Sequence, residues 1–356
     1  MNEWKKNLRK IKPYVPGEQS KDKDVVKLNA NENPYPPSPK AIEAIKSFDA
    51  EGLKKYPPSD AAQLKTAIAK HYGVGVENVF LGNGSDDVLA LAFQAFFNGG
   101  RAIAFPDITY SFYPVWCEMF KIPYRTYRLG EDFRINPEDY REENGGVVIP
   151  NPNAPTSIGE GVDFIEKILD YNRDSVVIID EAYADFGVQS AALFVNEDKY
   201  NNLLVTGTFS KSRSLAGLRI GFALGSAELI SVLEAVKNSY NSYTIDSLSI
   251  AAGTASVEDN EYFREVIDKI IKTRTRLTEA LRALGFTVFD SSANFVFATH
   301  DTLNMRDMFE YLKTKKVFIR YFNLPRIDNF VRITVGTDEE IDILLREIIN
   351  YTEEKI

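Results

Sequence analysis

The spacing of apolar residues changes along the chain and separates several regions. Residues 1 to about 36 are rich in Lys, Asn and Pro and show no clear period, which is typical of an arm that lies on another part of the fold. Helical spacing follows over 41–48 and 61–71. Short continuous apolar runs then alternate with helical segments, which predicts a mostly parallel sheet covered on both faces. We expect strands at 78–81, 102–105, 147–149, 176–179, 203–206 and 221–224, and a helix at 86–97.

The last third of the chain carries a second pattern. Helical spacing extends from about residue 228 to 284, and a final helix is expected over 339–351. Short strands of a smaller sheet are expected at 286–289, 294–298, 317–320 and 331–335. We therefore predict an α/β protein with an N-terminal arm (1–40) that joins a small domain, a large ligand-binding domain (41–240) and a small C-terminal α+β domain (241–356).

Charge and cysteine content exclude several classes of function. The 356 residues include 42 basic and 51 acidic side chains, a net charge of −9, whereas nucleic-acid binding needs a basic face. Cys117 is the only cysteine, and His71 and His300 are the only histidines, so neither an intrachain disulfide nor a metal-ligand cluster is expected. No signal-peptide core and no apolar run of membrane-spanning length is present. We expect a cytoplasmic protein that acts on small molecules, not on nucleic acid or membranes.

Lys211 is the first candidate for chemistry. Ligands of open α/β sheets bind beyond the carboxyl ends of the strands, so polar residues that follow the strands should converge on one site. Lys211 follows the strand at 203–206 within T-F-S-K-S-R-S-L-A-G-L-R, among small hydroxyl residues. A lysine there can lose hydration and serve as a Schiff-base nucleophile. Taken alone, a Ser-rich loop with incidental cations is the commoner explanation.

Other strand ends carry groups that would suit the same ligand. Asp180 ends an apolar strand and can face a ligand cation such as a pyridinium nitrogen, with Tyr183 three residues further on. The L-G-N-G-S-D-D segment at 81–87 opens a helix, whose free N–H groups can bind phosphate. Tyr110 can stack on a flat ring. Taken singly, each has an ordinary alternative: a strand-end cap, a helix N-cap by Ser85 or Asp86, and a core aromatic.

In this order the motifs resemble one family of enzymes. The chain resembles the fold-type-I pyridoxal-phosphate (PLP) enzymes of the aminotransferase class I/II superfamily, and most closely the histidinol-phosphate aminotransferases. The resemblance implies a large domain with a mostly parallel, seven-stranded type of sheet between helices, and a small α+β domain. The motifs that carry it are R-K-I-K-P-Y (9–14), L-N-A-N-E-N-P (28–34), K-Y-P (55–57), G-N-G-S-D-D (82–87), N-P-N-A-P-T (151–156), D-E-A-Y (180–183), S-K-S-R-S-L-A-G-L-R (210–219), A-N-F (293–295) and V-R-I-T-V-G-T (331–337).

The resemblance also implies roles for individual residues. Lys211 would hold PLP as a Schiff base and later shuttle the substrate proton. Asp180 would pair with the pyridine nitrogen, Tyr183 would contact the phenolic oxygen, and Tyr110 would stack on the ring. The implied phosphate site comprises Gly84, Ser85, Asp86, Thr208, Ser210 and Arg219, with Tyr56 from a neighbouring subunit of a homodimer. The implied substrate-binding residues are Tyr14, Asn31, Arg320 and Arg332.

One position departs from the family pattern. The family has Asn immediately before Pro-Thr-Gly, and that Asn contacts the phenolic oxygen of the cofactor. Here Ala154 occupies the position and Ser157 replaces the Gly. We expect Asn153, one residue earlier, to take over the contact.

The implied reaction transfers an amino group between histidinol phosphate and 2-oxoglutarate, giving imidazole-acetol phosphate and glutamate. An arginine fork fits both the phosphate of one substrate and the carboxylate of the other. A threonine-phosphate decarboxylase or an aromatic amino-acid aminotransferase of the same fold are alternatives. A dinucleotide-dependent oxidoreductase is an alternative from another class, which the missing G-x-G-x-x-G disfavours.

Overall fold

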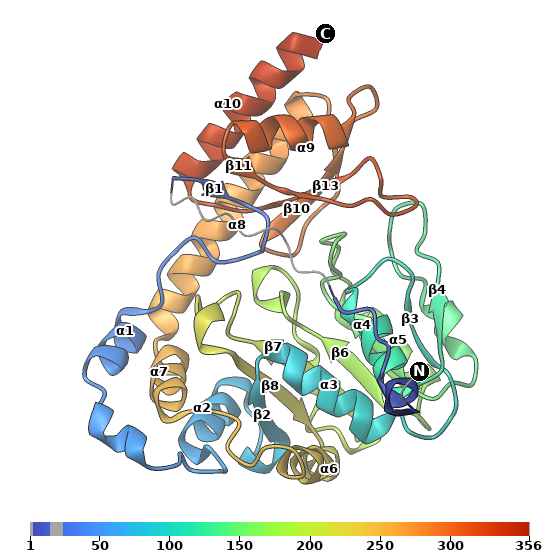
Figure 1. Ribbon diagram of the computed structural model, residues 1–356, viewed down its shortest axis with the longest axis vertical. Coiled ribbons are helices and arrows are strands. Elements are labelled where there is room, and N and C mark those ends of the chain that lie inside the picture. The colour runs from blue at the N-terminus through green and yellow to red at the C-terminus, as the bar shows by residue number, and fades with distance from the viewer. Residues whose placement is uncertain (1–2, 15–23, 356) are drawn as a thin grey trace.

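A computed structural model describes residues 3–14 and 24–355 of the chain. Figure 1 shows a large sheet flanked by helices in the lower half of the molecule and a smaller sheet beneath α9 (Met305–Thr314) and α10 (Asp338–Lys355) in the upper half. The long helix α8 (Asn260–Ala283) runs from the lower part into the upper part. Among the helices of the described residues, none is long and apolar enough to cross a membrane.

The large sheet has seven strands in the order β2-β8-β7-β6-β5-β3-β4. Strand β8 runs antiparallel to both of its neighbours, and the other pairs are parallel. Every residue of β3, β5, β6, β7 and β8 is buried, which explains their continuous apolar sequences. The predicted mostly parallel, helix-covered sheet is confirmed. The strands are β2 (Val79–Asn83), β3 (Ile103–Pro106), β4 (Tyr124–Tyr127), β5 (Val147–Pro150), β6 (Val177–Asp180), β7 (Leu203–Thr208) and β8 (Ile220–Gly225).

Helices cover the large sheet, and some of them were not predicted. Helices α4 (Phe112–Phe120) and α5 (Val162–Tyr171) and strand β4 were not predicted from the sequence. The region from 228 to 284, predicted as helical throughout, contains three helices, because the chain leaves helical geometry over 239–246 and again at Asp259. The helices of this part are α1 (Pro39–Lys46), α2 (Ala62–Tyr72), α3 (Ser85–Phe96), α4 (Phe112–Phe120), α5 (Val162–Tyr171), α6 (Ala227–Asn238) and α7 (Ser247–Glu258). Short 3-10 helices lie at Glu3–Asn7, Ala50–Lys54, Val76–Asn78, Pro137–Arg141, Ala184–Phe186, Ala191–Phe194, Asp198–Tyr200 and Ala216–Leu218.

The small sheet is antiparallel, with the order β12-β13-β10-β9. Its core is buried against α8, α9 and α10. Apolar residues of α9 repeat at helical spacing, and Met305, Met308 and Leu312 are fully buried. The elements are β9 (Thr287–Val288), β10 (Phe295–Thr299), α9 (Met305–Thr314), β12 (Arg320–Tyr321), β13 (Val331–Thr334) and α10 (Asp338–Lys355).

The predicted strand at 317–320 is wrong as a single element. Its first half, β11 (Val317–Phe318), leaves the small sheet and pairs in parallel with β1 (Val26–Lys27) of the N-terminal arm. Leu28, the residue after β1, stabilises this pairing. It donates its N–H to the Phe318 carbonyl at 2.7 Å, and its side chain is buried in the core of the small sheet. The arm therefore packs on the small domain.

Candidate active site

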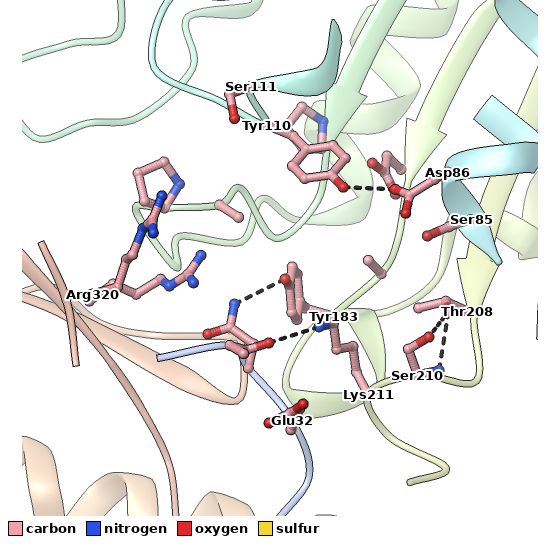
Figure 2. Close-up of a pocket in the computed structure, with 18 of the residues that line it drawn as sticks. Glu32, Ser85, Asp86, Tyr110, Ser111, Tyr183, Thr208, Ser210, Lys211 and Arg320 are labelled. Carbon is pink, nitrogen blue, oxygen red and sulfur yellow. Dashed lines mark hydrogen bonds between the residues drawn. The ribbon is translucent and has the colours of Figure 1, made fainter. Parts of the chain in front are cut away.

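A pocket of about 320 Å³ lies at the carboxyl ends of β5, β6 and β7, between the large sheet, the arm and the small sheet. Figure 2 shows Lys211 and Tyr183 at its floor, Tyr110 and Asp86 on one wall, and Arg320 on the opposite wall. Residues predicted from separate motifs therefore meet in space. Those that line the pocket are Tyr14, Asn31, Ser85, Asp86, Tyr110, Asp180, Tyr183, Thr208, Ser210, Lys211, Arg219, Arg320 and Arg332.

The Lys211 amine faces this pocket from the loop that follows β7. Its Nζ donates to the carbonyl of Ala30 in the arm at 3.2 Å and lies 5.8 Å from the ring of Tyr183. Asn33 of the arm donates its side-chain amide to the carbonyls of Lys211 and Ser212, at 3.0 and 3.3 Å. No acid of the described residues forms an ion pair with Lys211, so its amine is available to a ligand.

Asp180 ends β6 and is only 6% exposed. Tyr113 of α4 donates its hydroxyl to Asp180 Oδ2 at 2.7 Å, and Thr206 donates to Oδ1 at 3.3 Å. Burial raises the pKa of Asp180 to about 6, although the Tyr113 hydrogen bond acts in the opposite direction. A buried acid of this kind favours a cationic ligand, since a positive charge would replace the lost hydration.

Tyr183 is oriented by the arm. Asn31 donates its side-chain amide to the Tyr183 hydroxyl at 3.0 Å. Asn31 is itself fixed, because its N–H donates to the Thr334 hydroxyl and its carbonyl accepts from Asn294. The ring of Tyr183 packs edge-on against Phe295 at 5.0 Å. Asn31 was predicted to bind substrate, and here its amide is already bonded to Tyr183.

The start of α3 and the loop that follows β7 lie together at the pocket and carry groups that can bind an anion. Gly84 caps the helix at φ 84°, and a Cβ there would overlap the guanidinium of Arg219. Gly84 therefore shapes the site without lining the pocket. Thr208 donates its hydroxyl to Ser210 Oγ at 2.9 Å. Free N–H groups at a helix start, hydroxyls and a guanidinium together suit a phosphate group.

The carboxylate of Asp86 is held away from this role. It accepts a hydrogen bond from the Tyr110 hydroxyl at 2.7 Å and pairs with Arg219 at 3.4 Å. Burial and the Asp86 charge raise the pKa of Tyr110, so Tyr110 stays protonated and keeps donating. A phosphate would meet the backbone N–H of Asp86 rather than its side chain.

Two arginines form the opposite wall of the pocket. The guanidinium carbons of Arg320 and Arg332 lie 5.7 and 5.8 Å from the ring of Phe322. Arg332 also donates to the carbonyl of Asn29 at 3.0 Å. Burial lowers the pKa of Arg332, yet a guanidinium remains charged at neutral pH. Neither arginine pairs with an acid in the part of the chain that the structure describes, so the wall is suited to a ligand anion.

Tyr14 and Thr109 also line the pocket, and Tyr113 supports Asp180 from outside the lining; Thr109 and Tyr113 were absent from the predictions. Tyr14 stacks on Phe112 at 4.2 Å. Tyr113, which holds Asp180, sits three residues after Tyr110, and a tyrosine on a buried helix face needs a partner for its hydroxyl. Thr109 lines the pocket with a buried hydroxyl that has no hydrogen-bond partner among the described residues. The need of a buried tyrosine for a hydroxyl partner could have pointed to Tyr113, whereas nothing in the sequence points to Thr109.

Asn153 and Tyr56 do not line the pocket. Asn153 is 2% exposed and donates its amide to the Ile108 carbonyl and the Thr156 hydroxyl, at 2.9 and 3.0 Å. Ala154 faces the pocket in its place. Tyr56 is 80% exposed and stacks on Tyr243 at 4.5 Å, outside the pocket of its own chain.

Comparisons with known proteins identify the family of the chain. The family model for aminotransferase class I and II matches residues 23–348. The chain is 50% identical to a histidinol-phosphate aminotransferase of Clostridium acetobutylicum, over 97% of both chains. It is 52% identical to one of Acinetobacter baumannii, over 96% of this chain and 94% of that protein. Its fold matches a histidinol-phosphate aminotransferase of Sinorhizobium meliloti in complex with pyridoxal-5'-phosphate, with a TM-score of 0.81 at 23% identity and coverage of 92% and 91%. The chain belongs to the aminotransferase class I and II family and, within it, to the histidinol-phosphate aminotransferases.

Proposed function

We propose that the protein catalyses PLP-dependent transfer of an amino group from histidinol phosphate to 2-oxoglutarate, or the reverse. The observation that carries the proposal is the wall of Arg320 and Arg332, which faces Lys211 across one pocket and has no acid partner among the described residues. This wall can take the phosphate of one substrate and the carboxylate of the other. The names of the relatives at about 50% identity support the same reaction.

The residues of the pocket fit PLP. Lys211 offers a free amine, Asp180 a buried acid that lacks a cation, and the start of α3 an anion site. These correspond to the aldehyde, the ring nitrogen and the phosphate of the cofactor. The described residues hold no group of three potential metal ligands. When bound, PLP supplies an electron-withdrawing ring that stabilises charge at the substrate α-carbon.

The side chains of the protein divide the remaining work. The Lys211 amine would move the substrate proton, taking it from the α-carbon and returning it to the cofactor. The Asp180 carboxylate, held by Tyr113, would keep a proton on the ring nitrogen. Tyr183, oriented by Asn31, would donate towards the phenolic oxygen. Arg332 fixes the substrate anion, which sets the distance between the α-carbon and Lys211.

The two arginines should differ between the half-reactions. Arg332→Ala should weaken both glutamate and histidinol phosphate, because both anions occupy its place in turn. Arg320→Ala should weaken histidinol phosphate more, because a phosphate has more acceptor oxygens and more charge. Losing one charge-assisted hydrogen bond should cost about 1.5–3 kcal/mol, or about ten- to a hundredfold. Single-turnover measurements of each half-reaction test this.

Two results would redirect the proposal. Equal losses for both substrates in Arg320→Ala would place the recognition of phosphate elsewhere. An intact enzyme that does not turn over histidinol phosphate would favour the threonine-phosphate decarboxylase or aromatic aminotransferase alternatives, which assays with those substrates can separate.

We also propose that the enzyme is a homodimer with shared sites, since Tyr56 is exposed and lies outside the pocket of its own chain. Mixing inactive Lys211→Ala protein with weakened Tyr56→Ala protein should restore activity. Random exchange would leave about a quarter of the sites with both groups intact. Activity of the mixture that merely equals the sum of the parents, or a fully active monomer in sedimentation, would contradict the shared site.

A further inference from the structure

A cluster of phenylalanines joins the two sheets beside the pocket. Phe133, from the loop after β4, packs edge-on against Phe297 of β10 and Phe330, with ring centroids 5.8 and 5.3 Å apart. Phe297 and Phe330 stack at 4.6 Å. Phe297 also lies 6.3 Å from Phe322 in the pocket wall. The apolar contact between the sheets therefore ends at the ring beneath both pocket arginines.

Arg326 closes this contact from the loop between β12 and β13. Its Nη1 donates to Asp107 Oδ2 at 2.9 Å, and its Nη2 donates to the carbonyls of Leu129 and Gly130 at 2.8 and 3.2 Å. The guanidinium carbon lies 5.6 Å from the ring of Phe133. The Arg326 side chain is only 20% exposed. Three hydrogen bonds and an aromatic face distinguish this contact from an ordinary surface ion pair.

The backbone on both sides of this contact is unusual. Arg326 has φ 71° and Phe133 has φ 58°, in the left-handed region that non-glycine residues rarely adopt. Such conformations persist where surrounding contacts over-determine them, and they concentrate at functional sites.

The contact links two walls of the pocket. Asp107 directly follows β3, and its Oδ1 also accepts the N–H of Leu129 at 2.9 Å. Thr109 and Tyr110, two and three residues later, line one wall. The loop that carries Arg326 begins at Phe322 in the opposite wall. Arg326, a side chain outside the pocket, thus connects the segments that carry the two walls.

We propose that Arg326 is a positioning residue for the substrate-anion site. By anchoring the 322–330 loop on Asp107, it holds Phe322, and with it both pocket arginines, in the arrangement that binds the anion. The proposal rests on the proposed function only in that these arginines bind the substrate. Without the anchor, fewer molecules hold the competent arrangement, which lowers apparent affinity but leaves the chemistry after binding unchanged.

The test compares Arg326→Gln with Arg134→Gln. Arg326→Gln should raise KM for both glutamate and histidinol phosphate about tenfold, as expected when the competent fraction falls to about a tenth. Its kcat should stay within about twofold, and the absorbance spectrum of the bound cofactor should not change. Arg134 is the matched control. It directly follows Phe133, and its side chain, which is 53% exposed, pairs with Glu160 at 3.0 Å. Arg134→Gln should leave KM, kcat and the spectrum unchanged.

The other possible outcomes also decide between the proposal and its alternatives. An unchanged KM in Arg326→Gln would overturn the proposal, whether or not the melting temperature falls, and so would an equal rise of KM in Arg134→Gln. If Arg326→Gln does not fold, Asp107→Asn decides, because it can keep the Oδ1 acceptor for Leu129 while an amide NH2, which cannot accept from Arg326, replaces Oδ2; its KM must rise. An enzyme that uses glutamate but not histidinol phosphate would refute the proposed substrate and leave this test valid on glutamate.

Discussion

Replacing Lys211 by alanine should reduce transamination by about four orders of magnitude or more while the protein still folds. The Lys211 amine is the group proposed to move the α-proton, and no other described side chain offers an amine at the same place. Its loss should affect stability little, because Lys211 makes no ion pair with the described acids and its amine donates to one carbonyl, that of Ala30. Single-turnover conversion of glutamate measures the rate, and thermal unfolding checks the fold.

Lys27 provides the matched control, because it is the other lysine that lines the pocket. Its Nζ pairs with Glu32 at 2.6 Å, and a paired ammonium is a poor nucleophile. Borohydride treatment of the holoenzyme should leave the cofactor covalently attached to the peptide that contains Lys211, in the wild type and in Lys27→Ala alike. A label found on Lys27 would refute the assignment of Lys211.

The large sheet could be predicted from the sequence because its central strands are buried on both faces. Continuous apolar runs such as 176–179 have no competing interpretation once glycine and polar residues bound them. Strand β4 lies at the sheet edge. Its exposed residues Tyr124 and Thr126 alternate with the less exposed Arg125 and Tyr127, so the strand has no continuous apolar run. Helix α4 carries apolar residues on almost every side, with Glu118 its one charged residue, so its sequence lacks a clear helical period. Pattern analysis fails where an element is an edge or is almost wholly apolar.

The site could be predicted only as far as local sequence encodes it. Lys211 follows β7 and Asp180 ends β6; these strands are neighbours, and the ends of neighbouring parallel strands meet at one edge of the sheet. Tyr113 and Arg326 act through partners that are distant in sequence, Asp180 and Asp107. Lys27 reaches the pocket only because β1 pairs with β11. Such contacts depend on the folded chain and leave no mark in any one motif.

Asp180→Asn should lower transamination by about a hundred- to a thousandfold and at the same time stabilise the protein without its cofactor above pH 6. The rate falls because a neutral amide does not keep a proton on the ring nitrogen of the cofactor. The hydrogen bonds can survive, since an amide oxygen accepts from Tyr113 and an amide N–H donates to Thr206. The variant therefore removes the charge with little change of packing.

The sign of the stability effect follows from the raised pKa of Asp180. Below about pH 4 the carboxyl is protonated in both the folded and the unfolded chain, so its ionisation costs nothing. Between about pH 4 and the folded pKa of about 6, the unfolded chain loses the proton while the folded chain keeps it, and stability falls as pH rises. Above that range the full cost of the buried charge, about 2–3 kcal/mol, is present in the wild type and absent in the variant.

The cation on the bound cofactor should reverse the order of stability of the wild type and Asp180→Asn. Thermal unfolding at pH 8 should show a higher melting temperature for Asp180→Asn than for the wild type without PLP, and a larger PLP-induced increase for the wild type, because only its carboxylate gains a partner. At pH 5 the two cofactor-free proteins should differ less. A variant that is less stable than the wild type at pH 8 and retains near wild-type turnover would show that Asp180 only caps the end of β6, and that its buried charge does not serve the cofactor.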